Sequence, residues 1–209
     1  TGYGDSPYQS VSTFAGNPYF ISLEDLIEEK LLTREECESC DWGGSESYVD
    51  YEKMYMSRYK LLRKAYERSD FLKDKDYEIF LKEEKNWLTD YCLFMAIKNS
   101  QKGICWIDWP DELKDRHSKA VKEAEKELET EINFYRFQQY CFTTQWRKLK
   151  KYANKKGISI IGDVPIYVAL DSSDAWANPE MLQFDKDHNP KSVAGCPPVS
   201  YTHLDAADE

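Results

Sequence analysis

The chain has 209 residues, 41% of them hydrophobic and 32% charged, and its 38 acidic and 28 basic side chains give a formal net charge of −10. This composition is typical of a soluble globular protein and excludes a disordered chain. The acidic balance argues against nucleic-acid binding, because neutralising phosphate groups requires a clustered basic face. No run of about 18 apolar residues occurs, so the sequence predicts no membrane-spanning helix.

Residues 1–22 combine turn-forming residues with aromatic side chains. Glycine, proline, aspartate and serine are frequent from Thr1 to Ser10, and residues 14–19 have the same character. These residue types fix turns, so we expect an irregular segment here. Two interpretations stay open. The segment is either a long surface connection or a loop that faces a ligand, since binding residues concentrate on loops.

Residues 23–130 are predicted to be helical. Apolar residues recur at helical spacing, most clearly on one broad face from residue 77 to 98. Thr33 followed by Glu36 predicts a capping box at a helix start. Residues 119–129 alternate lysine and glutamate, which indicates a solvated helix face.

Residues 131–198 change pattern. A long helix is expected to end at Gly157, and the apolar run Ile158–Ile161 that follows is predicted to be a buried strand. This order forms one α/β unit of a parallel sheet and places Asp163 at or just beyond the strand's carboxyl end. There Asp163 is a candidate to bind a sugar hydroxyl, hold a metal or act as a base, or it only caps the loop. Ser172 or Ser173 is expected to cap a short helical turn.

Trp176, in the same segment, either stacks on a ligand or fills the core, and its spacing does not decide between the two. The aromatic and planar polar side chains of these loops suit sugar rings, which have apolar faces and hydroxyl edges.

The six cysteines are predicted to be reduced thiols of a cytoplasmic protein. Cys37 and Cys40 are the only close pair, and no histidine stands at zinc-site spacing, so we expect no metal site. The glycine patterns that cradle phosphates or dinucleotides are absent, and no cofactor is expected.

Several motifs follow one another along the chain. They are Gly2–Ser10, Phe14–Tyr19, Trp87 to Ala96, Trp106 with Trp109 and Pro110, Phe137 to Trp146, Gly162–Ala169, Asp171–Pro179 and Val193–Pro198. Through these motifs the chain resembles, over about residues 1–198, the 4-α-glucanotransferases, the amylomaltase or disproportionating-enzyme family. The motifs occur in the order of that family, which makes chance similarity a poor explanation.

The resemblance implies an α/β fold, a fragment of an (α/β)8 TIM barrel with a large helical insertion, mostly helical in the residues present. Residues 1–22 would be a substrate-binding loop that follows a barrel strand, and residues 23–130 the insertion. Residues 131–198 would supply a barrel helix, a strand and the following active-site loop. Residues 199–209 depart from the family pattern and are interpreted as a non-native tail.

The activity implied is the transfer of α-1,4-glucan segments between malto-oligosaccharides by a retaining double displacement. By resemblance, Ser6 and Tyr8 line the donor glucan subsites. Asp163 matches the acidic residue that follows the third barrel strand and contacts sugar near the cleavage point. Tyr3 matches an aromatic residue of a secondary glucan-binding platform, with Tyr51 as its partner.

The family's nucleophile, acid/base and third carboxylate lie further along its sequence. We therefore predict no catalytic residue within this chain and expect the chain alone to be inactive. Two alternatives remain. The parent protein is a glucan-binding protein with a degenerate active site, or it is a hydrolase of the α-amylase clan, to which the family belongs.

Overall fold

The computed structural model describes residues 6, 8–45, 47–162 and 168–192. Regular structure in this part of the chain is helical, and an isolated antiparallel bridge pairs Phe184 with Pro190. The α-helices are α1 (Leu23–Glu28), α2 (Arg34–Glu38), α3 (Tyr51–Arg68), α4 (Lys75–Glu83), α5 (Leu88–Ser100), α6 (Asp111–Lys114), α7 (Ser118–Glu127), α8 (Glu129–Lys155) and α9 (Ser173–Ala177). The 3-10 turns are η2 (Pro18–Phe20), η3 (Phe71–Lys73), η4 (Trp106–Asp108) and η5 (Pro179–Met181).

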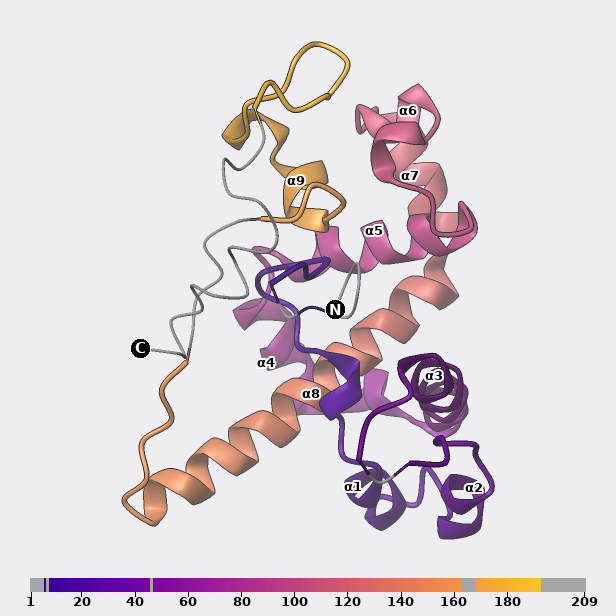
Figure 1. Ribbon diagram of the computed structural model, residues 1–209, viewed down its shortest axis with the longest axis vertical. Helices are drawn as coiled ribbons and strands as arrows, with labels where there is room; N and C mark the ends of the chain where they lie inside the picture. The colour runs from indigo at the N-terminus through magenta and orange to yellow at the C-terminus, as the bar shows by residue number, and fades with distance from the viewer. Residues whose placement is uncertain (1–5, 7, 46, 163–167, 193–209) are drawn as a thin grey trace.

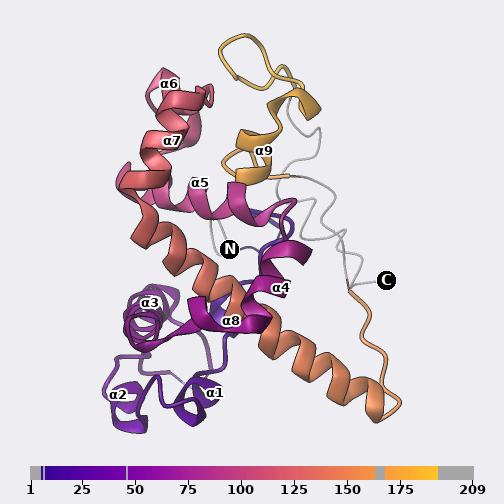
Figure 2. The ribbon, with the colours of Figure 1, turned by 180° about the vertical axis from the view of Figure 1, so that it is seen from behind.

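Helix α8 is the long helix expected from the sequence, and it runs through the whole molecule (Figure 1). Its buried face includes Phe134, Phe137 and Cys141, which pack into the core between α3 and α5. The helix ends at Lys155, and Gly157 just beyond it has a φ of +76°, a conformation that favours glycine. In the rear view, α5 crosses α8, and α9 packs on the side of α5 that faces away from α8 (Figure 2).

The capping box predicted at Thr33 is confirmed, and it also joins two helices. The Thr33 side chain accepts from the Glu36 N–H, and the Glu36 carboxylate accepts from the Thr33 N–H. The same carboxylate lies 2.8 Å from Arg68 and 2.9 Å from Lys64, both on α3. These bonds hold the pKa of Glu36 well below its usual value, Arg68 contributing first, then Lys64 and the Thr33 N–H.

We therefore expect the free energy of unfolding to fall as the pH drops below about 4.5, the ordinary value for this carboxyl. A group whose pKa is lowered by folding stabilises the folded state above its unfolded pKa, and this contribution is lost as it becomes protonated. Urea unfolding at pH 7, 5 and 3.5 measures the effect, and Glu36→Gln should flatten the pH dependence. Glu67→Gln, on α3 next to Arg68 but outside these ion pairs, is the matched control; equal pH slopes in both variants would contradict the assignment.

The apolar face from residue 77 to 98 does not belong to one helix. Helix α4 ends at Glu83 and α5 begins at Leu88. Between them Trp87 leaves helical geometry, with φ −134° and ψ −32°, and its Nε1–H donates to Glu84 Oε2 at 2.9 Å. Because the side chains on both sides of the break are buried, the periodic pattern continues across it.

The strand predicted over Ile158–Ile161 is not formed in the described chain. These residues are irregular, and Ile161 is 95% exposed. A parallel strand satisfies its backbone N–H and C=O groups only by pairing with neighbouring strands, and the described residues supply none. The fold described is therefore mostly helical, and the barrel expectation is not visible as a sheet.

Candidate functional site

The candidate site is built on residues 6 and 8–22, called here the N-terminal loop. As the sequence predicted, this segment is irregular apart from η2. Ser6 and Tyr8 lie together at its start. Ser6 Oγ accepts from the Tyr8 N–H at 3.3 Å, and the Ser6 carbonyl accepts from the Gln9 N–H at 3.2 Å. This turn leaves Tyr8 40% exposed, and its predicted role in the donor subsites stays a prediction.

One side of the loop is fixed to the start of α9. The Thr13 N–H and Oγ1–H donate to Asp174 Oδ2 at 2.7 and 2.9 Å, and Ser12 Oγ lies 3.4 Å from Oδ1. The Ser173 N–H donates to the Val11 carbonyl at 2.9 Å. The loop is thus joined to a segment about 160 residues away along the chain.

The other side of the loop is fixed to α8 by two glutamine side chains. Gln139 accepts from the Gly16 N–H at 2.8 Å and donates to the Gly16 carbonyl at 3.0 Å. Gln145 makes the same pair of bonds with Ser22, at 2.7 and 3.3 Å. Each amide satisfies both backbone groups of one loop residue, as a neighbouring strand would.

Held in this way, the loop presents aromatic side chains to solvent. Phe14 is 64% exposed and Phe20 77% exposed. The Phe14 ring stacks on Trp87, with ring centroids 6.3 Å apart and an interplanar angle of 19°. Exposed aromatic faces on a fixed backbone suit the apolar faces of sugar rings.

Tyr51, the expected partner of Tyr3, is the first residue of α3 and is 45% exposed. Its ring lies against Tyr19, with ring centroids 6.3 Å apart. Tyr51 therefore contacts the N-terminal loop at η2, about ten residues further along the chain than the turn at Ser6 and Tyr8. Tyr3 and Asp163 lie outside the described residues, and their predicted roles stay predictions.

The segment that follows Asp163 is anchored where the structure describes it again. Lys98 Nζ lies 2.6 Å from Asp171 Oδ2, and Trp106 Nε1–H donates to the Leu170 carbonyl at 2.8 Å. Ser172 caps α9 by accepting from the Ala175 N–H, which confirms the predicted cap. Both loops that carry candidate sugar contacts are therefore held by the helical body.

Trp176 fills the core, which decides the question left open by the sequence. Its side chain is fully buried, and Nε1–H donates to the Leu113 carbonyl at 3.0 Å. Phe94 and Trp109 pack on the indole, and the Arg116 guanidinium lies 4.1 Å from its ring centroid. Trp176 therefore belongs to the core and presents no face to solvent.

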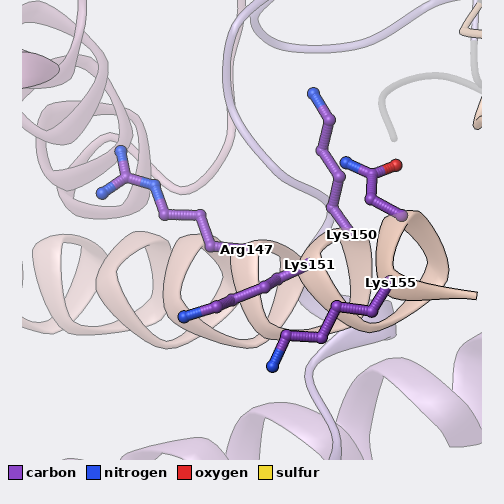
Figure 3. Close-up of a pocket in the computed structure, with 5 residues that line it drawn as sticks. Arg147, Lys150, Lys151 and Lys155 are labelled. Atoms are coloured by element: carbon purple, nitrogen blue, oxygen red, sulfur yellow. The ribbon is translucent and has the colours of Figure 1, made fainter.

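A shallow depression of about 500 Å³ lies at the carboxyl end of α8. Figure 3 shows cationic side chains from one stretch of the helix around it: Arg147, Lys150, Lys151 and Lys155. Arg147 pairs with Glu83 and Glu84 at 2.8 and 3.1 Å. The lining holds no aromatic face, so the depression does not suit a neutral sugar. Cations here also offset the negative end of the helix dipole.

Neither a metal-binding cluster nor a membrane-spanning helix occurs in the described residues. No group of three or more His, Cys, Asp or Glu side chains within the described ranges is arranged to hold a metal ion. Cys37 and Cys40 carry free thiols. None of the helices described is both long enough and apolar enough to cross a membrane.

Comparison with known proteins decides the family. A family model described as 4-alpha-glucanotransferase matches residues 1–204. The chain belongs to the 4-alpha-glucanotransferase family. The match confirms the resemblance found in the motifs and runs past residue 198, where the motifs end. The predicted non-native tail, residues 199–209, lies outside the described residues and stays a prediction.

Individual members of the 4-alpha-glucanotransferase family align over nearly the whole chain. The 4-alpha-glucanotransferase of Clostridium butyricum is 44% identical over 203 residues, covering 97% of this chain and 42% of that protein. The enzyme of Thermus thermophilus is 43% identical over 202 residues, covering 95% and 39%. A solved structure of the amylomaltase from Streptococcus agalactiae in complex with acarbose superposes with a TM-score of 0.88 at 38% identity, covering 94% of this chain and 40% of that one.

The chain thus spans about two fifths of the length of the curated relatives it matches, 42% and 40% in two of them. The helical fold described above is shared with the amylomaltase, since 94% of this chain superposes on that structure.

Sequence reasoning missed the residues that hold the loop in place. Gln139, Gln145 and Asp174 all lie inside motifs that carry the family resemblance, but the sequence patterns assign none of them a role. A signal was present for Gln139: a glutamine on the predicted inner face of an amphipathic helix needs a polar partner when buried. Its exposed fraction is 1%.

Proposed function

We propose that the whole protein is a 4-α-glucanotransferase that moves α-1,4-glucan segments between malto-oligosaccharides. The observation that carries the proposal is the family match over residues 1–204, with relatives of that activity at 44% identity. A glucan-binding protein with a degenerate active site and a hydrolase are not favoured, because the matched relatives are named as transferases.

The proposed substrate contacts lie on the two anchored loops. Ser6 and Tyr8 would line the donor subsites, and Asp163 would contact sugar near the bond that is cleaved. Tyr3 and Tyr51 would form a secondary glucan platform. The amylomaltase of the comparison holds acarbose, a glucan analogue, which supports a malto-oligosaccharide ligand for the same segments here.

The chemistry proposed is a retaining double displacement. A carboxylate nucleophile forms a covalent glycosyl-enzyme, while an acid/base protonates the leaving sugar oxygen and then deprotonates the acceptor hydroxyl. The resemblance assigns these carboxylates to a later part of the family's sequence. The segment described here would contribute substrate binding, and it needs no cofactor in this scheme.

We further propose that this segment belongs to an (α/β)8 barrel. Residues 1–22 would follow a barrel strand, residues 23–130 would be the helical insertion, and residues 131–198 would supply one barrel helix and strand. The apolar run Ile158–Ile161 supports this, because exposed isoleucines gain stability by packing in a sheet. A cytoplasmic location, expected from the cysteine usage, also stays a prediction.

Incubating the purified full-length protein with maltotriose tests the proposal. We expect glucose and longer malto-oligosaccharides with no net rise in reducing ends, because transfer conserves them. A steady rise in reducing ends would identify a hydrolase, and binding without any turnover would identify a glucan-binding protein.

Tyr8 supplies a site-specific variant for the same assay. Tyr8→Ala is expected to lower kcat/KM about tenfold, the loss expected when one stacking and hydrogen-bonding contact is removed. Tyr8→Phe keeps the ring and removes the hydroxyl, so its kcat/KM measures the contribution of the hydroxyl alone. Wild-type kinetics in Tyr8→Ala would remove Tyr8 from the site.

A further inference from the structure

Residues 10–15 form a compact turn whose polar groups converge on one carboxylate. Ser12 Oγ accepts from the N–H groups of Phe14 and Ala15 at 3.1 and 3.4 Å. Its hydroxyl is left to donate to Asp174 Oδ1, 3.4 Å away. Thr13 adds two further donors on Oδ2. A carboxylate accepts several hydrogen bonds at once, and such charge-assisted bonds are stronger than neutral ones.

Two serines beside this carboxylate are buried, whereas Thr13 and its bonds to Asp174 lie at the surface. Ser12 is 3% exposed and Ser173, which bonds the Val11 carbonyl, is 2% exposed. Opening the turn would leave these groups without partners, which is costly in a buried setting. The turn and the first residues of α9 therefore hold one relative position.

Asp174 links the two loops that carry the candidate glucan contacts, because it lies on α9 and binds the N-terminal loop. The turn it holds follows Ser6 and Tyr8 directly in the chain, and α9 follows the segment of Asp163. Gln139 fixes the loop to α8 at Gly16, beyond the turn. Without Asp174, the described hydrogen bonds between α9 and the part of the loop before Gly16 would be those from Ser173 to the Val11 carbonyl. The Phe14 ring would still stack on Trp87.

We propose that Asp174 is a positioning residue, which holds the Ser6–Tyr8 end of the N-terminal loop in its glucan-binding position against α9. The inference rests on the proposed glucanotransferase activity. Asp174 touches no reacting atom in this scheme; it acts through Thr13 and Ser12. Its removal should weaken substrate binding and leave the chemical step nearly unchanged.

The test measures the full-length protein in two ways: hydrogen exchange of the peptide covering residues 11–15, and kcat and KM on maltotriose. In Asp174→Ala we expect exchange about tenfold faster in that peptide, because the local opening free energy falls. We expect KM to rise about tenfold with kcat within about threefold, the pattern of lost ground-state binding. Asp174→Asn, which keeps one oxygen, should fall between Asp174→Ala and wild type.

Two sets of variants separate positioning from a general loss of structure. Thr13→Val removes one bond to Asp174 without touching α9 and should raise KM, whereas Thr13→Ser keeps both donors and should restore the wild-type value. Asp185→Ala is the matched control, because Asp185 accepts backbone N–H groups only within its own turn, from Asp187 and Asn189.

Unchanged exchange in Asp174→Ala would overturn the inference, as would faster exchange with an unchanged KM. Equal impairment of Thr13→Ser and Thr13→Val would also overturn it. If the wild-type protein does not act on malto-oligosaccharides, the proposed function fails. The exchange measurement then still decides whether Asp174 orders the loop.

Discussion

Replacing Trp176 with alanine is expected to lower the free energy of unfolding by about 3–5 kcal/mol, the usual cost of deleting a large buried aromatic side chain. The indole is fully buried against Phe94, Trp109 and the Arg116 guanidinium. The cavity opens beneath α9, so the segment that holds the N-terminal loop should loosen with it.

Urea unfolding of the full-length protein, with hydrogen exchange across residues 168–178, measures both effects. Trp176→Phe is the graded control. It keeps most of the ring and loses the bond from Nε1–H to the Leu113 carbonyl, so about 1–3 kcal/mol is expected. Full stability of Trp176→Ala would contradict the core role of the indole.

Gly16→Ala is expected to cost about 1–3 kcal/mol and to displace the N-terminal loop, because overpacked sites are relieved by backbone shifts. A Cβ atom at Gly16 would stand 2.0 Å from Phe142 Cδ1 and 2.3 Å from Cγ. The loop must move away from α8, and both hydrogen bonds from Gln139 to Gly16 lengthen or break. KM for malto-oligosaccharides should rise with the loss of stability.

Two comparisons make this prediction specific. Gly44→Ala changes a glycine with nothing within 4 Å of the new Cβ and should be nearly neutral. The double variant Gly16→Ala/Phe142→Ala removes the ring that causes the clash and should recover wild-type exchange in the loop. A double variant as perturbed as Gly16→Ala would show that steric conflict with Phe142 is not the cause.

Local features of the fold were predictable because they depend on neighbouring residues. The capping box at Thr33, the cap at Ser172 and the helix end at Gly157 each need only a few adjacent side chains. The long helix over residues 129–155 was predictable from its period, since its buried face repeats at helical spacing.

Two features of the fold differ from the sequence prediction, because they depend on more than the neighbouring residues. The break at Trp87 keeps the apolar period intact, so a pattern of buried positions does not reveal it. The run Ile158–Ile161 has strand character, but a strand exists only when other strands accept its hydrogen bonds. Its state depends on residues distant in the chain or outside it.

The candidate site, too, was predictable only in part. The sequence by itself determined the family, through motifs in order, and it placed Ser6, Tyr8 and Tyr51 as candidate sugar contacts. Only the tertiary structure decided that Trp176 belongs to the core and that Asp174, Gln139 and Gln145 hold the loop. The reason is physical: a motif records which residues are present, whereas an anchoring bond joins residues about 120 to 160 positions apart, and such pairs become visible only after the chain has folded.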